Sequence, residues 1–200
     1  MPRIDAPTVA EHHDRQRRAL LDAARALLAE TGQAPTMAAL ARRAGLARSS
    51  LYQYFTSPED LMRAVVADVF PGWATQVRRR VEDARTPGEQ VWAYVEANID
   101  LFAGSEQAVA QALSRVVDPD VLRGPMQQFH AQLQVPLRDA LAGLGEPNVA
   151  AMAEMIDSMI VQASRGAAAV PGPSCTSPEI QRTATLGLLR RVLSGYLNLD

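Results

Sequence analysis

The chain has 200 residues, of which 48% are hydrophobic, so it can bury a core in one large domain or two small ones. The formal net charge of −2 excludes a globally basic protein, but the charge is unevenly distributed. Residues 1–57 hold eight Arg and five acidic residues, whereas residues 58–200 hold twelve Arg and seventeen acidic residues. A locally positive segment suits a nucleic-acid partner, although ordinary variation in surface charge explains it equally well.

Targeting and redox signals are sparse. The N-terminal stretch carries no apolar core of a signal peptide, and no run approaches 18 uncharged apolar residues, so we expect no membrane partner. The single cysteine, Cys175, lies in the sequence PGPSCTSP, which is typical of a loop, and it has no second cysteine to pair with. These features predict a cytoplasmic protein.

Apolar residues recur at helical spacing along the whole chain, and no segment alternates as a strand does, so we predict an all-α fold. The first helix is expected over 12–31, ending at Gly32, and Thr36 is expected to cap the second helix. A helix capped by Ser57 should run to about residue 85, with a kink or split at Pro71-Gly72. Turn signals then separate helices near 88–103, 106–117, 119–143, 147–169 and 178–197.

Residues 36–55, TMAALARRAGLARSSLYQYF, predict two short helices joined by a turn at residues 44–46. Gly45 stands where the chain must turn, because glycine takes a positive φ without steric penalty. Leu51 and Phe55 form the inner stripe of the second helix, which we place at 47–54. Guanidinium, hydroxyl and amide groups remain on its outer face, and these are the groups that contact phosphates and base edges. The pattern is that of a helix-turn-helix with its recognition helix second.

The same stretch, together with SPEDLM at residues 57–62, resembles the signature of TetR-type transcriptional regulators. The resemblance implies a helix-turn-helix domain over 10–57 and a helical ligand-binding and dimerisation domain over 58–200. It implies a homodimer that binds a pseudo-palindromic DNA operator and responds to a small apolar effector. Two positions depart from the family pattern: Ala47 stands where a small polar residue usually caps the recognition helix, and Pro58 where a Lys usually faces the DNA backbone.

The resemblance also implies which residues act. It places Thr36, Tyr52 and Tyr54 on the DNA backbone and Arg48, Ser49 and Gln53 in the major groove. With the outward-facing hydroxyl of Ser50 added, the candidate DNA-binding set is Thr36, Arg48, Ser49, Ser50, Tyr52, Gln53 and Tyr54.

Met and aromatic residues of the predicted middle helices suit an adaptable apolar pocket, although most such side chains build cores. Our candidate pocket residues are Trp92, Asn98, Phe102, Met126, Phe129, His130, Met155 and Met159. The last two helices carry wide apolar stripes that either pack within the subunit or, as the resemblance favours, form a two-fold four-helix interface. The candidate interface residues are Met152, Ile156, Ile160, Ala163, Ala184, Gly187, Leu188 and Val192.

No catalytic arrangement, phosphate loop or metal-ligand spacing emerges, so we expect no enzyme activity, no metal and no cofactor. The adjacent pair His12-His13 does not share a helix face and is read as incidental. The alternative reading is a helical ligand-binding dimer with impaired or lost DNA binding, for which Ala47 and Pro58 are the signals.

Overall fold

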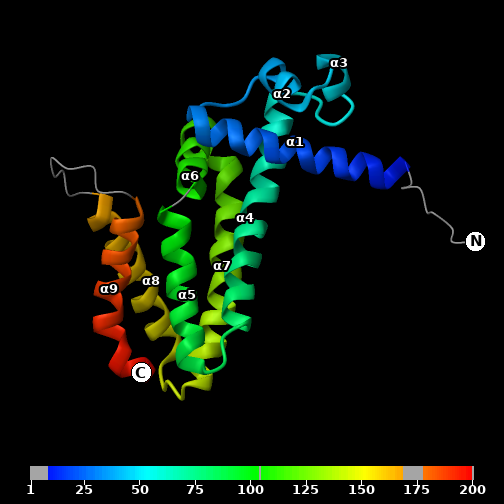
Figure 1. Ribbon diagram of the computed structural model, residues 1–200. Helices are drawn as coiled ribbons and strands as arrows, with labels where there is room; N and C mark the ends of the chain where they lie inside the picture. Colours follow the sequence, from blue (N-terminus) through cyan, green and yellow to red (C-terminus); the bar gives the residue numbers. More distant parts are fainter. Residues whose placement is uncertain (1–8, 104, 169–177, 200) are drawn as a thin grey trace, which may run out of the picture. The chain divides into compact units, whose positions relative to one another are not determined.

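The computed structural model describes residues 9–103, 105–168 and 178–199, and these are helical with no strand among them (Figure 1). The all-α fold class predicted from the sequence is confirmed. The helices of the described residues are α1 (Val9–Thr31), α2 (Met37–Ala44), α3 (Arg48–Leu51), α4 (Pro58–Glu82), α5 (Pro87–Ala103), α6 (Ser105–Val116), α7 (Pro119–Gly143), α8 (Val149–Ala168) and α9 (Pro178–Leu197). The predicted loop around Cys175 lies outside the described residues.

Two helices, α4 and α5, begin where side chains satisfy the first backbone N–H groups. Before α5, the Thr86 hydroxyl accepts from Glu89 N–H at 3.2 Å, and the Glu89 carboxylate accepts from Thr86 N–H at 3.0 Å. This reciprocal pair is a capping box. Before α4, the Ser57 hydroxyl accepts from Asp60 N–H at 3.1 Å, which confirms Ser57 as the cap. The predicted split of this helix at Pro71 is wrong, because α4 continues across it to Glu82.

The chain divides into two compact units. Unit 1 comprises Met1–Val69 and Ala108–Leu122, and unit 2 comprises Phe70–Gln107 and Arg123–Asp200. One continuous helix, α4, contributes its first half to unit 1 and its second half to unit 2. These units are defined by contacts within the chain. The predicted boundary between a DNA-binding domain ending at residue 57 and a ligand-binding domain starting at residue 58 concerns function and stays a prediction.

The core of unit 1 joins α1 to the short helices that follow it. Leu20 and Leu28 of α1, Leu40 of α2 and Leu51 of α3 have no exposed surface, and Phe55 is 1% exposed. Burying a side chain of this size contributes about 1.5–3 kcal/mol. The apolar stripes expected for the two short helices are thus confirmed as core, and the polar residues between them are left outside.

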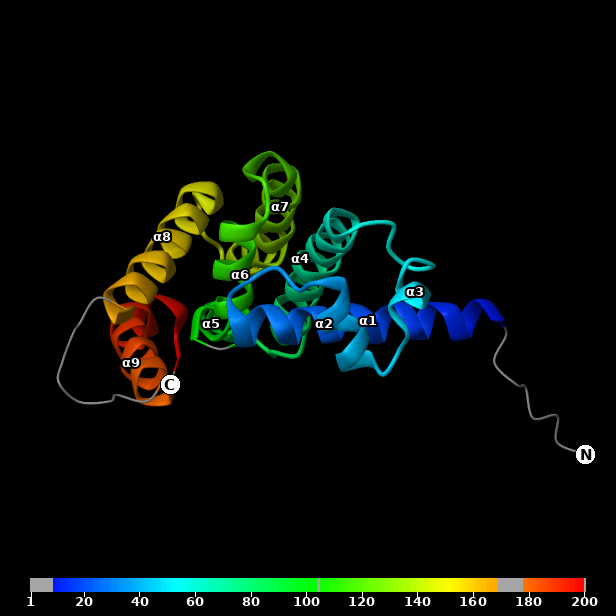
Figure 2. The ribbon, with the colours of Figure 1, turned by 90° about the horizontal axis from the view of Figure 1, so that it is seen from above.

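In unit 2, α5 packs against both α8 and α9, which lie side by side (Figure 2). The buried Tyr94 hydroxyl of α5 donates to Asp157 Oδ1 of α8 at 2.7 Å, and Gln134 of α7 donates to the other oxygen at 3.0 Å. Burial and the neighbouring Asp157 carboxylate raise the pKa of Tyr94, so the phenol stays protonated and remains a donor. The buried hydroxyl of Tyr94 and both carboxylate oxygens of Asp157 are therefore hydrogen-bonded across the helices of this unit.

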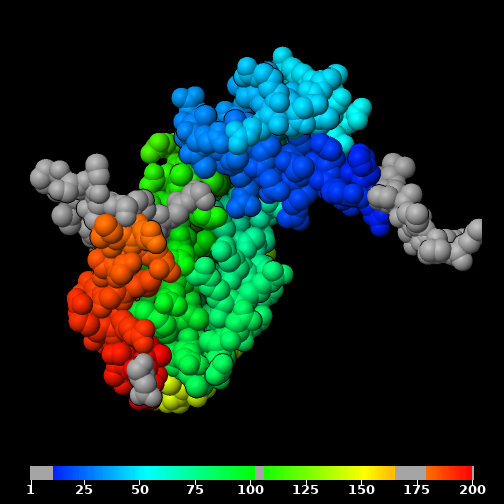
Figure 3. Space-filling model, in the orientation of Figure 1, coloured from blue at the N-terminus to red at the C-terminus, as the bar shows by residue number. Residues whose placement is uncertain are grey.

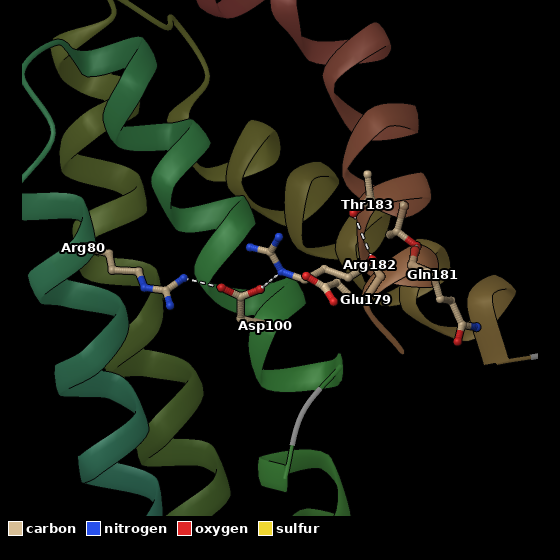
Figure 4. A network of polar contacts seen from close by, with 7 residues as sticks. Arg80, Asp100, Glu179, Gln181, Arg182 and Thr183 are labelled. Carbon is tan, nitrogen blue, oxygen red and sulfur yellow. Dashed lines mark hydrogen bonds and ion pairs between the residues drawn. The ribbon is translucent and has the colours of Figure 1, made fainter. Parts of the chain in front are cut away.

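Asp100 of α5 forms a second polar connection in unit 2. It accepts hydrogen bonds from Arg80 of α4 and Arg182 of α9, one on each carboxylate oxygen (Figure 4). Burial alone would raise the pKa of Asp100, but the hydrogen bonds from the two guanidinium groups hold it below its ordinary value. The carboxylate thereby ties three helices of the unit together.

Candidate DNA-binding site

The helix-turn-helix begins with a well-formed α2. The Thr36 hydroxyl accepts from Ala39 N–H at 3.1 Å, which confirms the predicted cap and leaves the hydroxyl hydrogen available to a phosphate oxygen. At the other end, Leu46 N–H donates to Ala41 C=O at 3.0 Å and Gly45 N–H to Arg42 C=O at 3.3 Å. This pair of bonds is a Schellman motif. Gly45 has a φ of 65°, so the turn requires glycine there, as predicted.

The recognition helix is shorter than the predicted range of 47–54. The helix α3 covers only Arg48–Leu51, and turns follow over residues 52–54. Ala47 occupies the cap position and offers no side-chain hydrogen bond to the first turn. Tyr54 N–H donates to Leu51 C=O at 2.9 Å, and Phe55 N–H donates to the same oxygen at 3.0 Å. The first of these is an i→i+3 bond of the 3₁₀ type, so the backbone forms a tighter turn after α3. The segment 48–54 therefore stays a compact helical turn.

The outer face of this segment is polar and accessible. Arg48, Ser49 and Gln53 are exposed, and Tyr52 is 44% exposed. Ser50 and Tyr54 are half-buried, while Leu51 and Phe55 point into the core of unit 1. The six predicted contact residues of the recognition segment thus keep polar groups on the side away from the core. Their role in binding DNA is taken up below.

Two further contacts position these side chains. The Arg48 guanidinium donates to the Tyr52 hydroxyl at 3.4 Å, one turn along. The imidazole of His13, from α1, stacks on the Tyr54 ring with centroids 4.6 Å apart and planes inclined by 22°. The stack fixes Tyr54 against α1. This contact could not be predicted from the sequence, because a pair of adjacent histidines does not indicate which residue either one contacts.

The arginines near the motif divide into structural and exposed ones. Arg43 of α2 makes a bidentate pair with Glu30 of α1, both N···O distances being 2.7 Å. Hydrogen bonding to Arg43 lowers the pKa of Glu30, so the carboxylate is charged at neutral pH. Arg17 lies over the Phe55 ring at 5.6 Å, and Arg18 lies 3.5 Å from Asp68. Arg48 stands on the outer face, where a charge is open to an anionic partner.

The candidate pocket residues are dispersed in unit 2. Trp92 and Phe129 are buried, and the buried Asn98 amide donates to the Tyr94 carbonyl of its own helix at 2.9 Å. Met126 and Met159 are half-buried, whereas His130 and Met155 are exposed. The Phe102 side chain lies outside the described residues. Missed by the sequence prediction, Phe70 and Trp73 of α4 pack against Phe129; their helical spacing gave only a core signal.

The candidate interface residues separate into two groups. Ile156 has no exposed surface and Ile160 is 3% exposed, so they belong to the core and are not available to a second subunit. Met152, Ala163 and Gly187 are half-buried, and Ala184 is exposed. Leu188 and Val192 of α9 are 50% and 59% exposed. Together with Met155 of α8 and Ile180 of α9, they make up what we call the α8–α9 apolar face. The space-filling view shows α9, in orange to red, at the surface (Figure 3).

The N-terminal region matches a known family of domains. Residues 20–65 match the family model described as "Bacterial regulatory proteins, tetR family". This range contains α2, α3 and the start of α4, which are the elements of the site just described. No curated protein matches the chain in sequence.

Solved structures share the fold over almost the whole chain. FadR from Bacillus subtilis, in complex with stearoyl-CoA, has a TM-score of 0.62 and 18% identity, covering 86% of this chain and 96% of its own. A TetR-family regulator from Pectobacterium atrosepticum has a TM-score of 0.60 and 23% identity, covering 94% and 97%. KstR2, the ketosteroid regulator of Mycobacterium tuberculosis, has a TM-score of 0.55 and 21% identity, covering 86% and 93%. At these identities the likeness shows the fold. With the N-terminal match, residues 20–65 are identified as the N-terminal domain of the tetR family of bacterial regulatory proteins.

The described residues show neither a membrane-spanning helix nor a metal-binding group. Within the described residues, no helix is long and apolar enough to cross a membrane. The same part of the chain contains no group of three or more His, Cys, Asp or Glu side chains arranged to hold a metal ion.

Proposed function

We propose that this TetR-family regulator is a repressor that binds a pseudo-palindromic operator as a homodimer and releases it when a small apolar effector binds. The observation that carries the DNA-binding part is the accessible polar face of the recognition segment. Arg48 and Gln53 can each bond a base edge in bidentate fashion, Arg to guanine and Gln to adenine. Thr36, Tyr52 and Tyr54 offer hydroxyl groups that suit phosphate oxygens.

Two subunits are needed because each recognition segment can occupy only one half-site, and successive half-sites lie about one DNA turn apart. The α8–α9 apolar face supports the dimer. Apolar side chains that are half exposed on two neighbouring helices lose their water contacts when a second copy covers them. A two-fold axis would place this face against itself.

A small apolar effector is supported by composition and by the relatives. Unit 2 is rich in buried aromatic and aliphatic side chains, and Trp73 and Phe129 contact one another inside it. FadR was solved with stearoyl-CoA and KstR2 is described as a ketosteroid regulator, and each of these compounds has a large apolar part, an acyl chain or a steroid ring system. A coupling of about 1–3 kcal/mol between effector and operator would lower operator affinity 5- to 150-fold.

The deciding experiment is a retardation assay on the DNA upstream of the chain's own gene, with wild type and two single variants. Gln53→Ala should lower affinity for the preferred half-site by about 1–3 kcal/mol and relax its sequence preference at one position. Tyr52→Phe should weaken binding to all sequences alike. Wild-type affinity should also fall roughly 10³-fold or more between low and moderate salt, because phosphate contacts release counterions.

The uncapped start of α3 at Ala47 favours the second reading, a helical ligand-binding dimer that no longer binds DNA. Absence of retardation by wild type at low salt, on this and on unrelated duplexes, would establish that reading in place of ours.

A further inference from the structure

One buried polar group in unit 2 has no partner. Trp73 of α4 is 5% exposed, and its indole Nε1–H is the one buried side-chain N or O among the described residues that makes no hydrogen bond. Leaving such a buried donor without a hydrogen-bond partner lowers the stability of the fold by about 1–3 kcal/mol. Elsewhere in the unit the buried polar groups of Tyr94 and Asn98 are paired. An orphaned donor in an otherwise satisfied interior needs a physical reason.

The surroundings of the indole are aromatic. Phe70 meets it edge to face, with centroids 5.6 Å apart and planes at 86°. Phe129 of α7 lies 6.1 Å from it, and the two phenylalanine rings are 5.4 Å apart. We call these three residues the aromatic cluster. It provides flat apolar surfaces and one hydrogen-bond donor, and none of its members carries a charge.

We propose that the aromatic cluster binds the effector and that Trp73 Nε1–H donates to a neutral acceptor oxygen on it. This rests on the proposed function, since it specifies the chemistry of that effector. The ligand is an aromatic or alicyclic compound with a ketone, ester or ether oxygen. A carboxylate is disfavoured, because a charge buried among uncharged rings has nothing to offset its lost hydration.

Binding acts on α4 directly. The rings of the cluster are in contact, so a flat ligand enters by separating Phe129 on α7 from Trp73 on α4. Residues Pro58–Val69 of the same continuous helix belong to unit 1, which holds the recognition segment. A displacement of α4 at Trp73 is thus carried along one helix towards the DNA-binding elements.

The test follows the two indole N–H signals of the full-length protein by ¹⁵N NMR, since the chain has only two tryptophans. Trp73→Phe and Trp92→Phe assign the signals. The probes are 2-acetylnaphthalene and 2-ethylnaphthalene, which share shape but differ in the acceptor oxygen. The ketone should move the Trp73 signal downfield and leave the Trp92 signal in place; the hydrocarbon should produce no downfield shift.

Affinities give the second readout. Wild type should bind the ketone about 3- to 10-fold more tightly than the hydrocarbon, as expected for one net hydrogen bond. Trp73→Phe should bind both equally, because the donor is gone. Three results would each overturn the proposal. The wild type could fail to bind the ketone at millimolar concentration, it could bind the ketone and the hydrocarbon with equal affinity, or its Trp73 signal could stay in place when the ketone is added.

Operator binding is measured separately on the same samples. A protein that shows the ketone preference but retards no DNA would retain the Trp73 site and refute the repressor function. A protein that binds operator but shows no ketone preference would support the repressor function and refute the Trp73 site. The two proposals therefore fail in distinguishable ways.

Discussion

The homodimer is the part of the proposed function that a single substitution tests most directly, and Leu188 is the residue to substitute. The side chain is 50% exposed and belongs to the α8–α9 apolar face. Full burial of a leucine contributes about 1.5–3 kcal/mol, so covering the remaining half contributes about 1 kcal/mol per subunit. The two-fold axis doubles this to about 2 kcal/mol per dimer, which corresponds to roughly a 30-fold change in the dissociation constant.

Leu188→Ala should therefore raise the dimer dissociation constant roughly 5- to 30-fold, the lower figure allowing for the methyl group that remains. Leu188→Arg adds a guanidinium from each subunit to a closed interface, where like charges lose hydration and repel, so it should give monomers at micromolar concentration. Both variants should keep the helical circular dichroism of wild type. Loss of the second half-site should abolish tight operator binding by Leu188→Arg.

Val135→Arg is the matched control. Val135 is 58% exposed, lies on α7, and undergoes the same change in charge and a similar change in size outside the α8–α9 apolar face. Sedimentation velocity across a concentration series compares the dimer dissociation constants of wild type and the three variants. If Val135→Arg weakens the dimer as much as Leu188→Arg does, or if wild type is a monomer at micromolar concentration, the assignment of this face is refuted.

Three smaller predictions concern single contacts. Asp100→Asn should lower the free energy of unfolding by about 1–2 kcal/mol at pH 7, because Arg80 and Arg182 lose their shared anion. The pKa of Asp100 is depressed on folding from a starting value of 3.8, so its stabilisation is present above that pH and is lost as the pH falls below it. Urea unfolding of both proteins should therefore differ at pH 7, and the difference should shrink as the pH falls below 3.8. His13→Ala should weaken binding to all DNA sequences a few-fold by freeing the stacked tyrosine, whereas His13→Phe should not; filter binding to two unrelated duplexes tests this. Thr36→Ala should cost about 1 kcal/mol in thermal unfolding through the lost cap, and Thr36→Ser should restore it.

Local signals accounted for most of the fold. The bounds of the longer helices followed from caps and turn residues, because Ser57 and Gly32 act within a few residues of their own position. The recognition helix was predicted too long at its C-terminal end, because residues 52–54 are compatible with a helix but form turns in which Tyr54 N–H bonds to Leu51 C=O. Pro71 was predicted to kink or split α4; the helix is not split, and side chains on both sides of the proline, such as Val69 and Trp73, are buried.

Contacts between distant residues could not be predicted in this way. Ile156 and Leu188 lie in equally apolar stripes, and only the packing of α5, α8 and α9 decides that one is core and the other exposed. The stack of His13 on Tyr54 and the orphaned indole of Trp73 have the same origin, since each depends on which group a neighbouring helix presents. Helical periodicity reports that a face is buried, but the partner that buries it is a property of the tertiary structure. This difference matters for the proposed function, because the fold requires only that a face be covered, whereas the effector recognition that we propose depends on the Trp73 indole, the one buried donor left unpaired among the described residues.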